Sequence, residues 1–283
     1  MATARQLLDR FNDSKTLPHV ALRLSKLISD EGSRIQEFEG LIKMDPVLVS
    51  RLLRMVNSPY YGVRENITSI ARAIVFIGMK NLRNIVVIEG LKCVVRKDPG
   101  AGMFSRRRLW LHSIAVSICS QMIVERIFGL RGEDAFLCGI LHDIGLIVED
   151  QTAPDLFART REAFSAESRS LLVLEREIIG TDHCEVGALL VQDWKLPEEI
   201  REGIQRHHAF DGATTPNSMA GAIQLSEFFS VKLGYGAFQG ATAGLSASLA
   251  AHVKGHLQEY RLLARDFPAQ MAMAQELYDH PEE

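Results

Sequence analysis

The sequence contains few cysteines, and they form no recognisable metal-binding or redox motif. Its 283 residues include only four, scattered among apolar neighbours without a Cys-x-x-Cys pair: Cys93, Cys119, Cys138 and Cys184. This usage is typical of small core residues in a reducing compartment, and it excludes a fold held together by disulfides. We therefore expect a cytoplasmic protein.

Long apolar runs and a strong net charge are also absent. Although 47% of the residues are hydrophobic, no run approaches the roughly 18 apolar residues that a membrane-spanning helix needs. Charges interrupt the first ten residues, where a secretory signal would have its apolar core. The net charge of −3 gives no overall field towards polyanions. We therefore expect no membrane association and no strong binding to nucleic acid.

Helical periodicity runs through most of the chain. Apolar residues recur three or four positions apart, as in the stretch from Leu48 to Val56. Asp45 and Pro46 mark its start, because Asp caps a helix and Pro fits the first turn. The same spacing predicts further helices in the first hundred residues, over the ranges 17–28, 70–77 and 81–95.

The clearest linker, Lys97-Asp-Pro-Gly-Ala-Gly102, separates two groups of helices. We predict an all-α protein, a bundle of two packed helical subdomains without a sheet of three or more strands. The expected divisions are an N-terminal subdomain over residues 1–102, a second subdomain over 103–236 and a C-terminal extension over 237–283. One long helix, from about His252 to Tyr278, is expected in the extension.

A histidine followed directly by an aspartate, His142-Asp143, lies within an apolar stretch that Glu133 and Asp134 are expected to cap. Burying a carboxylate costs several kcal/mol unless it is paired or bound to a metal. A hydrogen bond between the two side chains, or a helix N-terminus, would compensate for this cost. A transition metal would also do so, because imidazole and carboxylate both suit such an ion. The doublet alone leaves these alternatives open.

Four further histidines lie at helix ends or in an apolar helix, within about one hundred residues. His112 lies in a helix that is apolar on nearly all sides, and His183 lies in the first turn after a capping residue, Asp182. His207 and His208 end the helix that follows. As a set with the His-Asp doublet, they predict a pocket for one or two divalent transition-metal ions. An empty, hydrogen-bonded histidine cluster is the alternative.

The order of these residues resembles the HD superfamily of metal-dependent phosphohydrolases. From about residue 10 to 235, the chain resembles more closely an HDOD domain, the HD-related output domain of bacterial signalling proteins. The motifs in the first half that carry this resemblance are Leu17-Pro18, Ile42-Lys-Met-Asp45-Pro46, Leu52-Leu-Arg-Met-Val-Asn57-Ser58, Ile67-Thr-Ser-Ile70, and Ala73-Ile74 with Gly78. The resemblance implies an all-helical fold with an HD-like C-terminal part.

The second half is also similar to the HD-GYP cyclic-dinucleotide phosphodiesterases, through His183-Cys-Glu-Val-Gly187 and through His207-His208 followed by Asp211-Gly212. The resemblance implies that one metal ion is held by His112, His142, Asp143 and Glu227. It implies that a second ion shares Asp143 and is also held by His183, His207 and His208. Two ions roughly 3.5–4 Å apart can activate water on a phosphodiester, and Asp143 is the candidate catalytic residue if the protein is active.

The chain departs from the HD-GYP pattern where phosphate would be handled. HD-GYP enzymes usually have a lysine after the His-Asp-Ile-Gly motif, and this chain has Leu146. Arg108 stands where trinuclear members have a carboxylate, and Glu227 stands where the last aspartate is usual. The Gly-Tyr-Pro signature is missing after Asp211-Gly212. These departures predict metal binding with little turnover.

Two functions follow from these observations. In the first, the protein is a regulatory signalling module whose metal pocket, with or without a bound nucleotide, biases a helical surface that a partner protein recognises. In the second, it is a metal-dependent phosphohydrolase acting on a nucleotide or cyclic dinucleotide. Leu146 and the missing signature favour the first, whereas the nearly complete ligand set favours the second.

Overall fold

The computed structural model describes residues 2–13, 35–43, 46–58, 61–95, 105–166, 169–210, 212–238 and 243–278, and within these ranges the chain is helical and contains no strands. The described helices are α1 (Ala4–Asp13), α3 (Ile35–Lys43), α4 (Pro46–Val56), α5 (Ile70–Val95), α6 (Arg106–Arg126), α7 (Glu133–Leu141), α8 (Ile144–Thr152), α9 (Pro154–Ala166), α10 (Leu171–Ile178), α11 (His183–Asp193), α12 (Glu198–Arg206), α13 (Met219–Lys232), α14 (Ala247–Gly255) and α15 (Leu257–Tyr278). The predicted all-α class is confirmed. Among these helices, none has the length and apolar character needed to cross a membrane.

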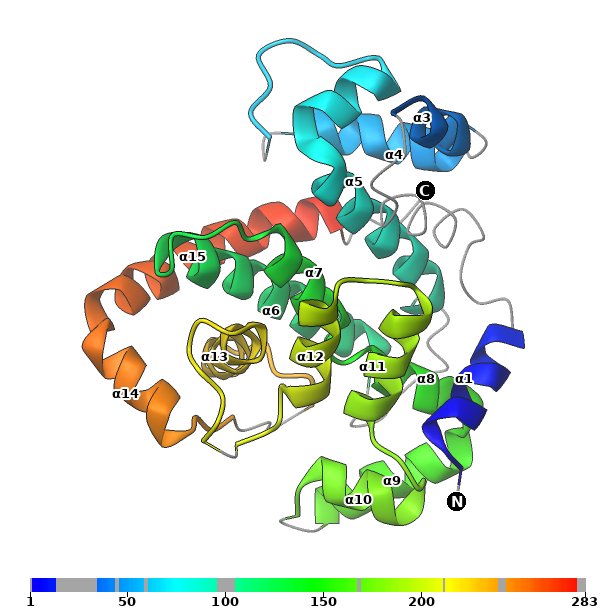
Figure 1. Ribbon diagram of the computed structural model, residues 1–283, viewed down its shortest axis with the longest axis vertical. Coiled ribbons are helices and arrows are strands. Elements are labelled where there is room, and N and C mark those ends of the chain that lie inside the picture. The colour runs from blue at the N-terminus through cyan, green and yellow to red at the C-terminus, as the bar shows by residue number, and fades with distance from the viewer. Residues whose placement is uncertain are drawn as a thin grey trace.

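In the first part of the chain, α3 and α4 pack against each other and against α5 (Figure 1). The break expected at Gly78 is present as a kink inside α5, where Gly78 has φ 78° and ψ 164°. A positive φ is easily adopted only by glycine, so the kink is encoded by this residue. The predicted helix over 17–28, the Asp45 cap and the linker at 97–102 lie outside the described residues, and the boundary between the subdomains remains a prediction.

Helix α1 lies apart from α3 and α4 and packs against α8 and α11 (Figure 1). Its apolar side chains Leu7, Leu8 and Phe11 are buried. An ion pair between Arg5 and Asp193, at the end of α11, joins the two elements with a distance of 2.6 Å. The N-terminal helix therefore covers the part of the chain that carries the histidines.

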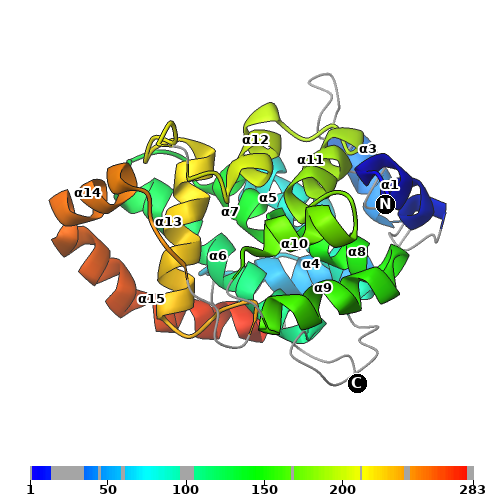
Figure 2. The ribbon, with the colours of Figure 1, turned by 90° about the horizontal axis from the view of Figure 1, so that it is seen from below.

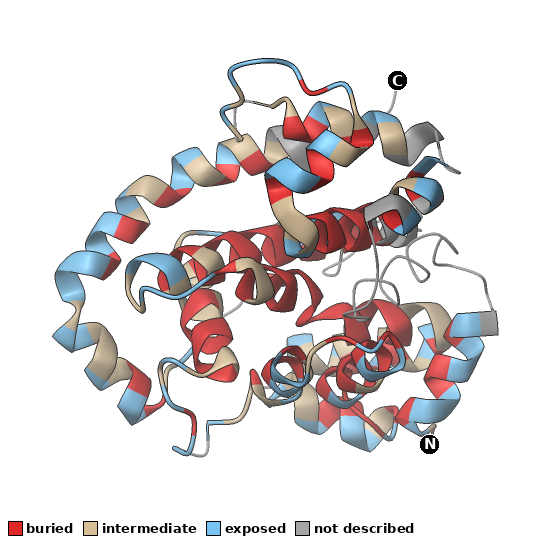
Figure 3. Cartoon of the chain, turned by 45° about the horizontal axis from the view of Figure 1, so that its top comes forward, coloured by how far each residue is buried: buried red, intermediate tan, exposed pale blue. Residues whose placement is uncertain are grey.

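Helix α6 forms the centre of the second part, between α7, α13 and α15. It begins after Ser105, whose side chain accepts a hydrogen bond from the backbone N–H of Arg108, and its residues are buried along most of its length. This confirms the expectation of a helix that is apolar on nearly all sides. Figure 3 shows the buried residues gathered along these central helices.

The C-terminal extension differs from the prediction. Instead of one helix from about His252 to Tyr278, the chain forms α14 and α15, which are separated by a break at His256 with φ −119° and ψ 32°. Helix α15 packs along α6 through Tyr260, Phe267 and Met271, which are fully buried. Figure 2 shows α14 at the end of the molecule opposite α1.

Polar contacts between α5 and α7 join the first part of the chain to the second. Arg83, which is almost fully buried, forms an ion pair of 2.5 Å with Asp134, and Lys80 contacts the other carboxylate oxygen of Asp134 at 2.5 Å. Asn84 donates a hydrogen bond of 2.8 Å to the backbone oxygen of Glu133. The expectation that Glu133 and Asp134 cap the helix is corrected here, because Gly132 is the N-cap and Asp134 is engaged by α5.

Candidate metal centre

The His-Asp doublet lies in the junction between two helices, because α7 ends at Leu141 and α8 begins at Ile144. Asp143 occupies the N-cap position of α8, but its side chain makes no capping hydrogen bond. The carboxylate is therefore directed to other partners. It is nevertheless almost completely buried, with 5% of the residue exposed.

Four imidazoles surround the Asp143 carboxylate. Its Oδ2 atom lies 3.3 Å from Nε2 of His142 and 3.6 Å from Nε2 of His112. Its Oδ1 atom lies 3.5 Å from Nε2 of His207 and 3.6 Å from Nε2 of His183. These side chains come from α6, the α7–α8 junction, the start of α11 and the end of α12, so packing of the helices brings together the residues that the sequence singles out.

The outer nitrogen of three of these rings is held by a backbone oxygen. The Nδ1 atoms of His112, His142 and His207 lie 2.6, 2.8 and 2.6 Å from the carbonyl oxygens of Tyr235, Gly139 and Ile204, respectively. A carbonyl oxygen only accepts, so each Nδ1 atom carries the proton and donates it. In the neutral form of each ring, the Nε2 atom facing Asp143 is left with a lone pair, as in metal-ligating histidines.

The inward-facing atoms fit a metal ion better than a network of hydrogen bonds. The Nε2 atoms of His112 and His142 lie 3.2 Å apart, and two lone pairs cannot form a hydrogen bond with each other. The Nε2 atom of His183 is buried without any hydrogen-bond partner. A cation placed among these atoms would give all of them a partner, and imidazole with carboxylate suits a divalent transition metal.

Two groups of side chains could hold such an ion, and Asp143 belongs to both. In each group, the potential ligand atoms all lie within 4.8 Å of one another. One group consists of His112, His142 and Asp143, and the other of Asp143, His183, His207 and His208. The predicted convergence of these six residues is thus present in the fold.

Glu227, the remaining expected ligand, belongs to neither group. It extends from α13, and its Oε2 atom lies 3.9 Å from Nδ1 of His208. The side chains of His208 and Glu227 are 25% and 18% exposed, so the two residues form the solvent-facing edge of the cluster. A ligand role for Glu227 remains a prediction.

Burial and neighbouring charges set the electrostatics of the cluster. Burial lowers the pKa of His112, and the adjacent His142 lowers it further. Burial opposes ionisation of Asp143, yet the surrounding imidazoles hold its pKa well below the usual range. For His183 the effect of burial is outweighed by the negative charge of Cys184 and Glu175, which raise its pKa well above the usual value. Positive charge is therefore disfavoured on the His112 ring and favoured on the His183 ring.

Two residues that contact the cluster, Cys184 and Glu175, were not predicted from the sequence to do so. The Cys184 thiol lies 3.7 Å from Nδ1 of His207, and its pKa is lowered to about 7, against the effect of burial, by His183 and His207. Glu175 on α10 is fully buried and lies 2.8 Å from Nδ1 of His183. The sequence signal that could have predicted a buried, partnered Glu175 is the presence of a carboxylate among the apolar residues of the helix from Leu171 to Ile178.

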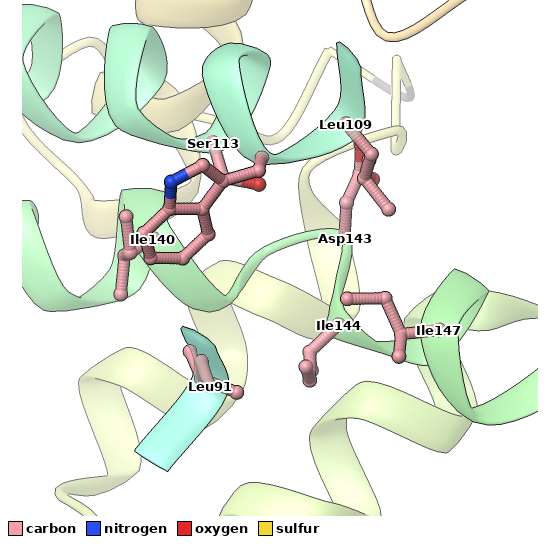
Figure 4. A pocket seen from close by; sticks show the side chains of 8 residues that line it. Leu91, Leu109, Ser113, Ile140, Asp143, Ile144 and Ile147 are labelled. Carbon is pink, nitrogen blue, oxygen red and sulfur yellow. The ribbon is translucent and has the colours of Figure 1, made fainter. Parts of the chain in front are cut away.

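A small cavity adjoins the cluster beside Asp143 (Figure 4). Its volume is about 10 Å³, which is enough for one water molecule. Apolar side chains, including Ile140 and Ile147, form most of its wall, and Leu91 of α5 closes one side. The first part of the chain thus lies directly against the His-Asp junction.

Leu146 and Arg108 are two of the positions that differ from HD-GYP enzymes, and neither side chain supplies a positive charge to the cluster. Leu146 is 1% exposed and packs into the hydrophobic core from α8. Arg108 is exposed on the surface of α6. Arg106, two residues before it, forms a buried ion pair of 2.6 Å with Asp150.

Comparison with known families and structures places the chain in context. The model of the HDOD domain matches residues 15–210. An uncharacterised protein of Treponema pallidum (strain Nichols) is 26% identical over 214 residues, which cover 72% of this chain and 39% of that protein. The chain therefore spans about two fifths of the length of this curated relative.

Three similar crystal structures carry different names. A candidate phosphohydrolase of Shewanella amazonensis SB2B is 26% identical, with a TM-score of 0.68 over 96% of this chain and 97% of the other. An HDOD domain protein of unknown function from Geobacter sulfurreducens is 22% identical, with a TM-score of 0.65 over 89% and 92%. A candidate signal transduction protein of Marinobacter aquaeolei VT8 is 19% identical, with a TM-score of 0.72 over 95% and 61%. The last two likenesses establish the shared fold alone.

Proposed function

This chain belongs to the HDOD domain family, and on that basis we propose that it is a signalling module in which a metal ion, held by the buried histidine–aspartate cluster, stabilises a helical surface for a partner protein. In this proposal one ion is held by His112, His142 and Asp143, and a second ion would share Asp143 and be held also by His183, His207 and His208. A bound divalent ion would supply the positive charge that Asp143 and the imidazoles lack. Its role is to fix the arrangement of helices rather than to carry out hydrolysis.

The burial of the cluster is the observation that supports this proposal most strongly. His112, His142, Asp143, His183 and His207 are all buried, and the adjoining cavity has a volume of about 10 Å³. Sites for ligands of nucleotide size are clefts of roughly 300–1,000 Å³. A phosphodiester would therefore reach the shared ligand Asp143 only after a rearrangement of the surrounding helices.

The missing positive charge supports the same conclusion. Phosphoryl transfer depends on cationic groups that neutralise charge on the phosphate oxygens, and loss of one such group typically lowers the rate by about 10²–10³. Leu146 fills the corresponding position with a buried hydrocarbon, and Arg108 is exposed on α6. The residues around the cluster are thus better suited to holding a metal than to turning over a phosphate ester.

In this proposal the partner protein binds the outer face of α5. Val75 and Phe76, in its first half, are 71% and 50% exposed, which is high for apolar side chains. The second half of α5 is attached to α7 through Arg83 and Asp134, and α7 leads directly into His142. A metal ion that stabilises the α7–α8 junction would therefore also stabilise α7, against which the second half of α5 packs.

A phosphohydrolase is the second candidate function. It is supported by the two ligand groups that share Asp143, an arrangement suited to two-metal catalysis. The solvent-facing edge at His208 and Glu227 is the side from which a substrate would approach. In that case Asp143 would be the central catalytic residue.

A hydrolysis assay separates the two functions. The purified protein, loaded in turn with iron, manganese or zinc, would be incubated with a panel of cyclic dinucleotides and nucleotides, and products would be separated by chromatography. We expect no product above the level seen with an Asp143→Asn variant. Metal-dependent turnover of the wild-type protein, abolished in that variant, would establish the phosphohydrolase instead.

A further inference from the structure

Glu175 contacts the metal cluster from the side opposite Asp143. Its Oε1 and Oε2 atoms lie 2.9 and 2.8 Å from Nδ1 of His183, and Oε2 also accepts a hydrogen bond of 3.2 Å from the backbone N–H of His183. The Glu175 side chain is fully buried. It therefore occupies the outer nitrogen of a ring whose inner nitrogen faces Asp143.

His183 differs in this respect from the other three imidazoles around Asp143. Their Nδ1 atoms are held by neutral carbonyl oxygens, whereas Nδ1 of His183 is held by a carboxylate. A charged acceptor makes a hydrogen bond roughly twice as strong as a neutral one. It also increases the electron density of the ring, and so strengthens the opposite nitrogen as a metal ligand.

A separate constraint on His183 acts on its backbone. Asp182 caps α11 by accepting a hydrogen bond of 2.9 Å from the N–H of Glu185, which fixes the first turn where His183 lies. Nothing in that cap determines which ring nitrogen carries the proton. The Nε2 atom of His183, buried and without a hydrogen-bond partner, depends on Glu175 for its orientation.

We propose that Glu175 is a positioning residue of the metal centre, which holds the proton of His183 on Nδ1 and so presents Nε2 as the ligand atom beside Asp143. This inference rests on the proposed function, in that the cluster holds a metal. It adds a residue of α10 to a centre otherwise built from α6, the α7–α8 junction and the ends of α11 and α12.

Glu149 offers a matched control for Glu175. It lies on α8, is equally buried, and is near enough to Glu175 for the two negative charges to repel each other. Its side chain faces Glu175 and makes no contact with His183 that resembles the hydrogen bond of Glu175. A Glu149→Gln variant therefore changes a buried carboxylate of the same size in the same region without removing the hydrogen bond to His183.

The experiment combines nitrogen-15 NMR of the histidine rings with metal titration, using the full chain. Wild type, Glu175→Leu, Glu175→Gln and Glu149→Gln would be compared, each checked for its helical circular dichroism spectrum. In wild type and Glu149→Gln, the neutral His183 ring, observed at a pH above its pKa, should carry its proton on Nδ1 before zinc is added and bind zinc through Nε2. Glu175→Leu should lose this preference and bind zinc about 10–100-fold more weakly.

The Glu175→Gln variant keeps an oxygen acceptor but loses the charge. We expect His183 in this variant to retain its Nδ1 proton, and we expect zinc to bind with an affinity between those of wild type and Glu175→Leu. If the leucine variant does not fold, an unchanged zinc affinity in Glu175→Gln would overturn the proposal. A folded leucine variant with wild-type proton placement and affinity would also overturn it. Failure of wild type to bind zinc would instead refute the proposed function, while the proton placement would still test Glu175.

Discussion

Gly145 and His183 lie in direct backbone contact. A Cβ atom on residue 145 would come within 2.1 Å of the His183 carbonyl oxygen and 2.6 Å of its Cα atom. Because the obstructing atoms belong to the backbone, they cannot move aside as a flexible side chain would. The glycine of the His-Asp-Ile-Gly segment therefore allows the first turn of α8 to approach the first turn of α11, which brings Asp143 and His183 together.

Replacing Gly145 by alanine should separate these two helix starts. We expect Gly145→Ala to lower the free energy of unfolding by about 1–3 kcal/mol, the usual range for overpacking. It should also weaken metal binding, since Asp143 and His183 would move apart. Thermal unfolding and a zinc titration would test both effects. Gly255→Ala is the control, because a Cβ atom there meets nothing within 4 Å; equal behaviour of the two variants would contradict the interpretation.

A lysine at position 146 should not restore phosphate handling. Leu146 is buried in the hydrophobic core, so Leu146→Lys would place an ammonium group among apolar side chains. Leaving a buried charge uncompensated typically costs about 3–5 kcal/mol. We expect a large fall in the denaturant midpoint and no gain of hydrolysis, with Leu146→Met close to wild type. A stable Leu146→Lys protein that hydrolyses cyclic dinucleotides would refute this prediction.

Glu149 should make stability depend on pH. Burial raises the pKa of Glu149 well above the usual value of 4.5, and the negative charges of Glu175 and Asp182 raise it further. His183 lowers the pKa but does not cancel these effects. The folded state thus favours the protonated acid. The stability contributed by that proton is fully present below the unfolded-state pKa, and it is lost as the pH rises through the folded-state pKa.

The Glu149→Gln variant cannot titrate at this position, so it isolates the effect. We expect its stability advantage over wild type to grow as the pH rises from about 4.5 towards neutrality, because only wild type must then give up the favoured proton of Glu149. Urea unfolding of both proteins across this range would measure it. An advantage that is independent of pH would show that Glu149 does not titrate there.

The contact between Arg83 and Asp134 should contribute more than a surface ion pair. Arg83 is buried, so Asp134→Asn would leave its charge without a full partner. We expect a loss of about 1–3 kcal/mol, because Asp134 itself is partly exposed and Lys80 is nearby. The control is Glu198→Gln, which removes an exposed pair with Arg201 and should change the stability little, because solvent screens exposed ion pairs. Similar thermal shifts in both variants would argue against a stabilising role for the α5–α7 contact.

The sequence predicted the class of fold and most of the cluster because both leave local signals. Helical spacing predicted α4 and α6, and histidines in apolar surroundings predicted that His112 and the His142-Asp143 doublet converge with those of α11 and α12. Polar residues in such surroundings need partners, and this requirement is independent of the details of packing.

Other features depend on packing that the sequence does not display. The apolar pattern continues through His256, so the break between α14 and α15 was missed. Glu175 was missed because its partner, His183, lies in another helix. The position of the Glu227 side chain beside His208 depends on how α13 lies against α12 and α6.

Metal content measured by mass spectrometry after exhaustive dialysis tests the central claim most directly. Wild type, Asp143→Asn and His256→Ala would be compared, since Asp143 belongs to both ligand groups and His256 lies at the exposed break before α15. We predict at least one tightly bound transition-metal ion per wild-type chain, the same content in His256→Ala, and a strongly reduced content in Asp143→Asn. A metal-free wild-type protein, or equal metal content in all three, would contradict the account.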